Sequence, residues 1–165
     1  MLTTPALRRL ALGCAVLLLG ATAPGIATGS QASGAAVAAP EAPPARGGSP
    51  QSTVDRVADF YGTYIDVLFD SGQGRLSHAL RNHYLTPELR HSLARWEATH
   101  QKDGVLRATG VPTAWKVVYN DSGMGHCWSR VTLTWKVAEN HVRHTHLMIQ
   151  SDIATRLISG LKVEK

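Results

Sequence analysis

The apolar residues of this chain change their spacing near Gly104, and this change limits the folds that the sequence can adopt. Before Gly104, apolar side chains recur at three- and four-residue intervals, as on one face of a helix. After Gly104, apolar and polar residues alternate, as in strands with one buried face. Helices that come first and antiparallel strands that follow predict the α+β class, with N-terminal helices packed on a curved antiparallel sheet.

The first predicted helix begins at Ser52 or Thr53. The Ser52 side chain can cap it, and the Asp55 side chain is placed to cap the backbone of Ser52 in turn. Glycines within residues 70–74 end the helix. Its apolar face is expected to consist of Val54, Val57, Tyr61, Ile65 and Leu68, widened by Ala58, Tyr64 and Phe69.

Two shorter helices are predicted between this helix and Gly104. One covers residues 75–84, with an apolar face of Leu76, Leu80 and Tyr84. The other begins after Thr86, which can cap it, and Pro87 suits its first position because proline lacks the N–H that would be unpaired there. This third helix runs to about His100, with an apolar face of Leu89, Leu93 and Trp96.

The strands are expected to wrap the first helix. The clearest alternation places Cys127, Ser129, Val131, Leu133, Trp135 and Val137 on one face and Trp128, Arg130, Thr132, Thr134 and Lys136 on the other. An earlier strand is predicted around Trp115, Val117 and Tyr119, and later ones at 141–151 and 157–163, with Gly160 a candidate bulge. Residues 105–112 are expected to hold a short strand or a loop.

The N-terminal residues predict secretion. Arg8 and Arg9 precede an apolar run of secretory length, so residues 1–27 are interpreted as a Sec-type signal peptide cleaved after Ala27 or, alternatively, after Ala32. A retained membrane anchor is the other interpretation, but no stable membrane insertion is expected after cleavage. Residues 28–52, rich in Ala, Pro, Gly and Ser, are predicted to be a disordered linker, and residues 53–165 a single domain.

Charge and cysteine content exclude some classes of protein. The formal charge of +5 includes Arg8 and Arg9; without them, fifteen basic residues face twelve acidic ones. This mild excess is scattered, which argues against a nucleic-acid partner. Loss of Cys14 with the signal peptide leaves Cys127 alone, so no intrachain disulfide is expected. Cys127 is interpreted as a buried apolar residue, and the alternatives are a reactive thiol or an intermolecular disulfide.

The sequence HVRHTH, residues 141–146, is the most concentrated group of candidate functional side chains. His144 and His146 share one face of a strand, which supplies two metal ligands where three or four are needed. His126 could be a third only in one register, so no metal site and no cofactor are predicted. Either histidine could instead act as a general base in an enclosed pocket. Asp152 lies too far along the strand to orient His146.

Other carboxylates could approach these histidines from elsewhere, namely Asp59, Asp66 or Asp103. A predicted ligand- or partner-binding surface consists of Trp128, Arg130, His126 and Arg143, because Trp128 alternates with polar residues on the face opposite Val131. The helical histidines, His78, His83, His91 and His100, lie among Arg81, Arg90 and Arg95 and are interpreted as a solvated basic surface.

Two motifs resemble a known superfamily. They are Tyr61-Gly62-Thr63-Tyr64-Ile65 in the first helix and Tyr84-Leu85-Thr86-Pro87-Glu88-Leu89 between the next two. With the strand meander that follows, they resemble the nuclear-transport-factor-2-like (cystatin-like) superfamily, and within it small secreted actinobacterial proteins of undefined function. The resemblance implies a conical sheet with a pocket between its concave face and the helices. The superfamily includes dehydratases, isomerases and epoxide hydrolases, and also members that only bind or dimerise.

Two functional hypotheses follow. The first is a secreted, non-enzymatic module that binds a small molecule or a protein partner, or that forms a homodimer through its sheet. Its basis is that no nucleophile elbow, phosphate loop or dense ligand cluster can be recognised in the sequence. The alternative is a pocket enzyme with dehydratase- or isomerase-like acid–base chemistry, in which His144 or His146 is the base.

Overall fold

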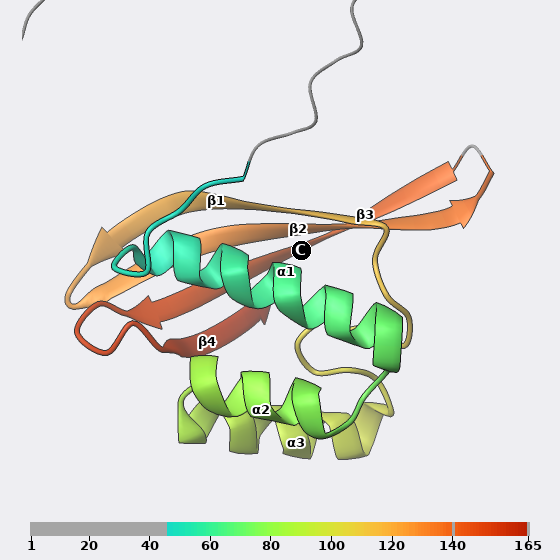
Figure 1. Ribbon diagram of the computed structural model, residues 1–165, viewed down its shortest axis with the longest axis horizontal. Helices are drawn as coiled ribbons and strands as arrows, with labels where there is room; N and C mark the ends of the chain where they lie inside the picture. The colour runs from blue at the N-terminus through green and yellow to red at the C-terminus, as the bar shows by residue number, and fades with distance from the viewer. Residues whose placement is uncertain (1–45, 140, 165) are drawn as a thin grey trace, which may run out of the picture. The chain divides into compact units, whose positions relative to one another are not determined.

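The computed structural model describes residues 46–139 and 141–164, which form three helices followed by four strands (Figure 1). The helices are α1 (Thr53–Ser71), α2 (Arg75–Tyr84) and α3 (Pro87–His100). The strands β1 (Ala114–Gly123), β2 (His126–Ala138), β3 (His141–Asp152) and β4 (Ile158–Val163) form one antiparallel sheet in the order β1-β2-β3-β4. The predicted α+β class and the predicted order of its elements are confirmed.

Some predicted segments lie outside this range. They are the signal peptide at residues 1–27, residues 28–45 of the linker, and Asn140 in the predicted turn. Within the described ranges, no helix has the length and apolar character needed to cross a membrane.

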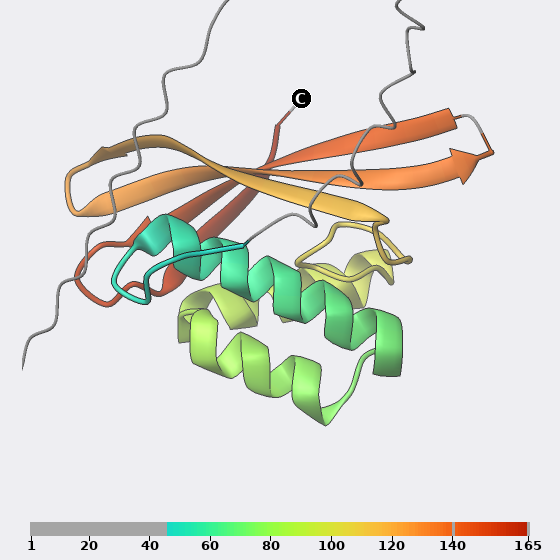
Figure 2. The same ribbon diagram turned by 45° about the horizontal axis from the view of Figure 1, so that its top comes forward.

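The sheet curves over α1, and α2 and α3 lie on the other side of that helix (Figures 1 and 2). Val57, Tyr61 and Ile65 of α1 belong to the same buried cluster as Val131 and Leu133 of β2. Trp135, Leu147 and Ile149 complete the inner face of the sheet in that cluster. The prediction that the inward residues of the long strand pack on the first helix is therefore confirmed.

Local sequence signals position the helices. The Ser52 hydroxyl accepts a hydrogen bond from the Asp55 N–H at 3.1 Å, and the Thr86 hydroxyl accepts one from the Leu89 N–H at 3.3 Å. Gly72 ends α1 with a φ of 68°, a left-handed backbone conformation that glycine adopts easily. The prediction for the Asp55 side chain was wrong, because its carboxylate accepts from the N–H of Ser49 at 2.8 Å rather than from that of Ser52.

The predicted apolar face of α2 is correct for Leu80 and Tyr84, which pack against the core, and wrong for Leu76. Leu76 is 57% exposed, whereas Ser77 and Arg81 are buried. The helix is rotated because Arg81 forms ion pairs with partners on α3 and the following loop. On α1, Phe69 also departs from the prediction and is 79% exposed.

The hairpin between β2 and β3 extends past the helices (Figure 1). Val137, predicted to face the core, is 60% exposed there, and Val142 is 55% exposed. The register of β2 and β3 shifts between Lys136 and Ala138, beyond the last residue that pairs with β1. At the other end of β3, a register shift opposite Gly160 and Ile158 leaves Ser159 as the extra residue, so the bulge predicted near Gly160 is confirmed.

Candidate ligand-binding site

A cluster of buried polar side chains joins all three helices to the loop that leads to the sheet. Tyr64 comes from α1, Arg81 from α2 and Glu97 from α3, while Asp103 begins the loop. The Arg81 guanidinium donates to both Glu97 carboxylate oxygens, at 3.1 and 2.7 Å, and to Asp103 Oδ2 at 3.0 Å. Two of its nitrogens also donate to the Tyr64 hydroxyl, at 2.9 and 2.6 Å. One arginine therefore connects the three other members.

The Asp103 carboxylate accepts hydrogen bonds from five donors. Its Oδ2 accepts from the Tyr64 hydroxyl at 2.6 Å, from Gln73 Nε2 at 2.9 Å and from Arg81. Its Oδ1 accepts from the backbone N–H groups of Val105 and Leu106, both at 2.8 Å. Five donors therefore occupy the acceptor capacity of this buried carboxylate.

The pKa values of Tyr64 and Arg81, which both contact Asp103, are raised. Burial, reinforced by the adjacent Asp103 carboxylate, raises the pKa of Tyr64 well above its usual range. Burial acts against the charge of Arg81, but the hydrogen bond to Glu97 and the nearby acidic groups outweigh it and raise the pKa of Arg81. The cluster consequently contains a neutral tyrosine and a charged arginine across the physiological pH range.

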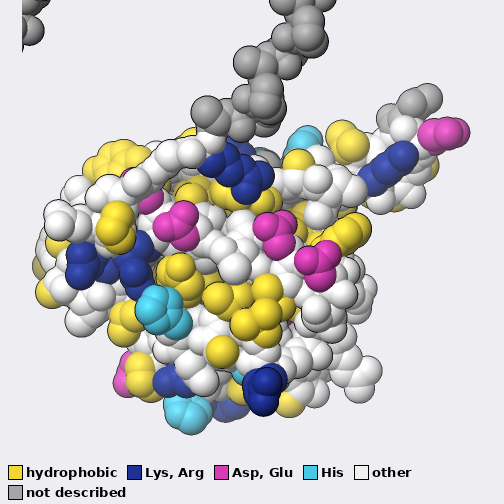
Figure 3. Space-filling model, viewed as in Figure 1, with side chains coloured by type: hydrophobic (Ala, Val, Ile, Leu, Met, Phe, Trp, Pro, Cys, Tyr) yellow, Lys and Arg dark blue, Asp and Glu magenta, His cyan; other side chains and the backbone are white. Residues whose placement is uncertain are grey.

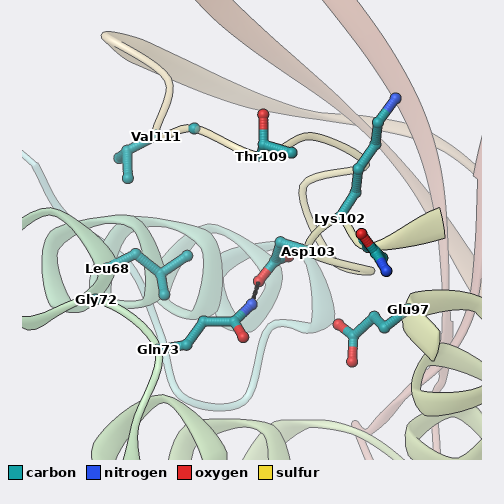
Figure 4. Close-up of a pocket in the computed structure, with 10 residues that line it drawn as sticks. Leu68, Gly72, Gln73, Glu97, Lys102, Asp103, Thr109 and Val111 are labelled. Carbon is teal, nitrogen blue, oxygen red and sulfur yellow. Dashed lines mark hydrogen bonds between the residues drawn. The ribbon is translucent and has the colours of Figure 1, made fainter.

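A cleft of about 400 Å³ opens above this cluster, between the end of α1, the end of α3 and the loop (Figure 4). Its lining is Leu68, Gly72, Gln73, Glu97, Gln101, Lys102, Asp103, Thr109, Gly110 and Val111. In Figure 4 the Gln73 side chain points to Asp103 across the floor of the cleft, and the ammonium of Lys102 points away from it. Gln73 keeps a carbonyl oxygen, and Glu97 Oε2 keeps a lone pair, because each forms a single hydrogen bond there. The floor can therefore accept hydrogen bonds from a ligand.

The two candidate catalytic histidines lie on the outer face of the sheet, away from the helices. His144 and His146 are exposed, and their Nδ1 atoms lie 3.1 Å from the hydroxyls of Thr134 and Thr132 on the neighbouring strand. Their rings are stacked with centroids 6.4 Å apart. Neither histidine lines one of the clefts described, so the enclosed pocket that the catalytic hypothesis requires does not surround them.

The four residues of the predicted contact surface do not form a single site. Trp128 is half-buried, and His126 meets it edge to face with centroids 5.9 Å apart. Arg130 is exposed but forms an ion pair with Glu164 at 2.8 Å. Arg143 lies on the protruding hairpin, with its guanidinium 5.9 Å from the Trp135 ring centroid. The register pairs His126, rather than His146, with Asp152.

Cys127 and Arg81, two other residues considered in the sequence, are both buried. Cys127 is buried, as predicted, and it forms no disulfide with the described residues. Arg81 was predicted to belong to a solvated basic surface, and that was wrong for this residue because it is only 8% exposed. The four helical histidines, His78, His83, His91 and His100, are exposed. Among the described side chains, no group of three or more His, Cys, Asp or Glu residues is arranged to hold a metal ion.

Sequence reasoning missed the polar cluster because each of its members also fits a simpler interpretation. Arg81 stands among other basic helical residues, and Asp103 precedes a helix-ending glycine. A usable signal was present: Ser77 and Arg81 lie four residues apart on one side of α2, which places both on one helical face.

Comparisons with known proteins identify the fold without a function. No family model and no curated protein matches the chain. A solved structure of a protein of unknown function from Bacteroides thetaiotaomicron is similar, with a TM-score of 0.54 and 17% sequence identity. The similarity covers 68% of this chain and 89% of that one. At this identity the comparison supports the α+β fold alone.

Proposed function

We propose that this protein is a secreted, non-enzymatic binding module, and that a small ligand rich in hydrogen-bond donors binds in the cleft above Asp103. The observation that carries the proposal is the cleft floor, where Gln73 and Glu97 keep free acceptor capacity while Arg81 and Asp103 hold them in place. A cleft of about 400 Å³ matches the size of small-molecule sites. Leu68 and Val111 offer an apolar wall for the rest of the ligand.

Asp103 and Tyr64, two groups at the base of the cleft, are held by internal hydrogen bonds, which favours a positioning role over a catalytic one for both. A general base must be able to accept a proton from a substrate, and the Asp103 carboxylate already accepts five hydrogen bonds. The Tyr64 hydroxyl donates to Asp103 and accepts from Arg81, and its raised pKa keeps it protonated. A preorganised network of this kind positions a ligand without a reorganisation cost at binding.

The charge of the floor indicates which donors it prefers. The carboxylates of Glu97 and Asp103 form ion pairs with the Arg81 guanidinium at 2.7 and 3.0 Å, and the Arg107 guanidinium is also close enough to both to interact with their charges. An ammonium therefore gains more than a neutral hydroxyl from the free lone pair on Glu97. Ligands with both hydroxyl and ammonium groups, such as amino sugars, have the matching chemistry.

We place the fold within the nuclear-transport-factor-2-like cone as part of this proposal. Supporting features are the three helices before the strand meander and the position of α1 on the inner side of the curved sheet (Figure 2). Buried side chains of α1 and of the sheet, such as Tyr61 and Leu133, belong to one packed cluster. The proposed ligand cleft is accordingly placed at the end of α1 instead of inside the cone.

A titration with glucosamine tests the proposal. Amide NMR signals of Gln73, Gly104 and Thr109 should shift with glucosamine, and more weakly with N-acetylglucosamine, which lacks the ammonium. Glu97→Gln should reduce the response to glucosamine, and Gln73→Ala provides a second variant if the loss of Glu97 weakens folding. Glu88→Gln, an exposed glutamate on the same helix, is the matched control. Equal responses to the two sugars, or no response at the cleft, would contradict the proposal.

Self-association through the outer face of the sheet is a second candidate function. The helices cover one side of the sheet, and the other carries half-buried Trp128 and Met148 and exposed Val118. Uncovered apolar side chains on a sheet face are typical of protein contact surfaces. Sedimentation velocity over a range of concentrations should then show a dimer that Trp128→Ser abolishes, and a monomer at every concentration would exclude this candidate.

A further inference from the structure

A second groove runs between α1 and the edge strand β1. Two adjoining clefts, of about 690 and 500 Å³, share the lining residues Arg46, Asp66 and Trp115. Asp59 and Thr63 of α1 line the larger cleft, and both are exposed. Figure 3 shows acidic side chains along α1 on this face of the molecule. The groove is therefore acidic on its helix side and aromatic on its strand side.

An arginine of the chain itself already occupies the aromatic side of the groove. The guanidinium of Arg46 lies 4.8 Å from the centroid of the Trp115 ring, which is cation–π geometry. The residues that follow, predicted to belong to the linker, lie against α1, since the Ser49 N–H donates to Asp55. Arg46, Asp59 and Asp66 are absent from the ion pairs of the described residues, so both carboxylates keep their capacity to pair with a cation.

The floor of the groove is rigid. The Trp115 indole packs so closely on α1 that a methyl group at Gly62 would lie 2.7 Å from its Cζ2 atom. Trp115 is half-buried, which leaves one side of the ring for the guanidinium. An indole packed on α1, in a groove that carboxylates also line, is a preorganised site for a cationic side chain.

The outer edge of β1 adds backbone groups to this site. Among the described strands, β1 pairs with β2 alone, so its other edge has no strand partner. Trp115 and Val117 belong to this strand and line the groove together with Lys116. An extended segment that pairs with the free edge could also place a side chain in the groove.

We propose that the α1–β1 groove binds an extended segment of a partner protein through an arginine side chain. The guanidinium of that arginine stacks on Trp115 in a groove whose α1 side carries the carboxylates of Asp59 and Asp66, and the segment pairs with the free edge of β1. In the unbound protein, Arg46 holds the place of the incoming arginine and competes with it. The groove shares Val111 with the cleft above Asp103, but Asp59, Asp66 and Trp115 line the groove alone, so variants at these residues test this proposal independently of the first.

Peptide titrations of the full chain test this inference. The probes are an acetylated and amidated Thr-Val-Arg-Val-Thr peptide and its Thr-Val-Gln-Val-Thr counterpart, followed by the indole N–H signal of Trp115. The arginine peptide should bind more tightly than the glutamine peptide. Arg46→Ala removes the internal competitor and should tighten binding of the arginine peptide by roughly two- to fivefold.

Substitutions of two aspartates distinguish binding in the groove from general charge attraction. Asp66→Asn should weaken binding of the arginine peptide by roughly two- to fivefold. Asp70→Asn removes the same charge from an exposed position of α1 outside the groove and should leave binding unchanged. Equal affinity for the two peptides, equal effects of the two aspartate variants, or weaker binding to the Arg46→Ala variant would each overturn the inference.

Discussion

Asp103 is the residue at which the helices and the loop before the sheet meet. Tyr64 and Gln73 donate to one of its oxygens, and the N–H groups of Val105 and Leu106 donate to the other. These bonds hold Val105 and Leu106, both completely buried, in the core. The carboxylate therefore positions the loop that forms one wall of the proposed ligand cleft.

Replacement of Arg81 should be severely destabilising. Arg81→Met leaves the buried carboxylate of Asp103 and the half-buried carboxylate of Glu97 without their ion-pair partner, which costs about 3–5 kcal/mol of the free energy of unfolding. Urea denaturation measures this cost. Arg75→Met, on an exposed position of the same helix, should change stability by less than about 0.5 kcal/mol. Similar effects of the two substitutions would show that the cluster does not stabilise the fold.

Tyr64 should make stability depend on alkaline pH. Its pKa is raised in the folded protein, first by burial and then by the Asp103 charge, whereas in the unfolded chain it is about 10. Its contribution is therefore complete below about pH 10 and is lost as the pH rises above that value, because only the unfolded chain then releases the proton.

Thermal unfolding from pH 7 to 11 tests this prediction. The melting temperature should fall less steeply above pH 10 for Tyr64→Phe than for the unaltered protein. At neutral pH the same variant should lose about 1–3 kcal/mol, because Asp103 and Arg81 each lose a buried hydrogen-bond partner. Identical alkaline profiles would mean that Tyr64 titrates alike in the folded and unfolded states.

At the scale of elements, α1 and β1 pack closely where Gly62 meets Trp115, at the α1–β1 groove. Alanine favours a helix by about 1 kcal/mol over glycine, so Gly62→Ala should stabilise an isolated α1. In the protein the new methyl group would overlap Trp115, at 2.7 Å, and overpacking costs about 1–3 kcal/mol. We therefore expect Gly62→Ala to lower the free energy of unfolding.

Thr63→Ala is the matched control for this substitution. Thr63 is exposed on the same helix, so the change removes a β-branched residue without a packing penalty and should leave stability equal or slightly higher. The indole N–H signal of Trp115 should move in Gly62→Ala and stay in place in Thr63→Ala. A stabilised Gly62→Ala variant would contradict the packing of α1 on β1.

The sequence predicted those elements whose signals are local. The caps at Ser52 and Thr86 and the alternation through Val131 and Leu133 act within a few residues, and the structure contains the elements that they indicate. The face of α2 was not predictable in this way. Its rotation depends on Glu97 and Asp103, which are distant in the sequence and attract Arg81 inward. The exposure of Val137 likewise depends on where the neighbouring strands end.

The candidate site was less predictable than the fold because it depends on contacts between residues that are distant in the sequence. The histidines at 144 and 146 stand out in the sequence because they are close together, yet the structure places them on the outer face of the sheet. The cleft is built from residues of α1, α3 and the loops after α1 and α3, each unremarkable in its own segment. Only the tertiary fold brings Gln73 next to Asp103.

At the scale of the whole molecule, the proposed secretion predicts the first residue of the mature protein. N-terminal sequencing of protein recovered from the culture medium should give Thr28 or Ser33, the residues that follow the two candidate cleavage sites. Protein that still begins with Met1 and sediments with membranes would indicate a retained anchor.

The position of a bound ligand tests the central claim most directly. We expect a crystal structure of the complex with glucosamine to place the ammonium or a hydroxyl within hydrogen-bond distance of Glu97 Oε2 and of the Gln73 side chain. Arg81, Asp103 and Tyr64 should keep the hydrogen bonds that they form in the free protein. A ligand bound instead at His144 and His146, or one that separates Arg81 from Asp103, would contradict the account.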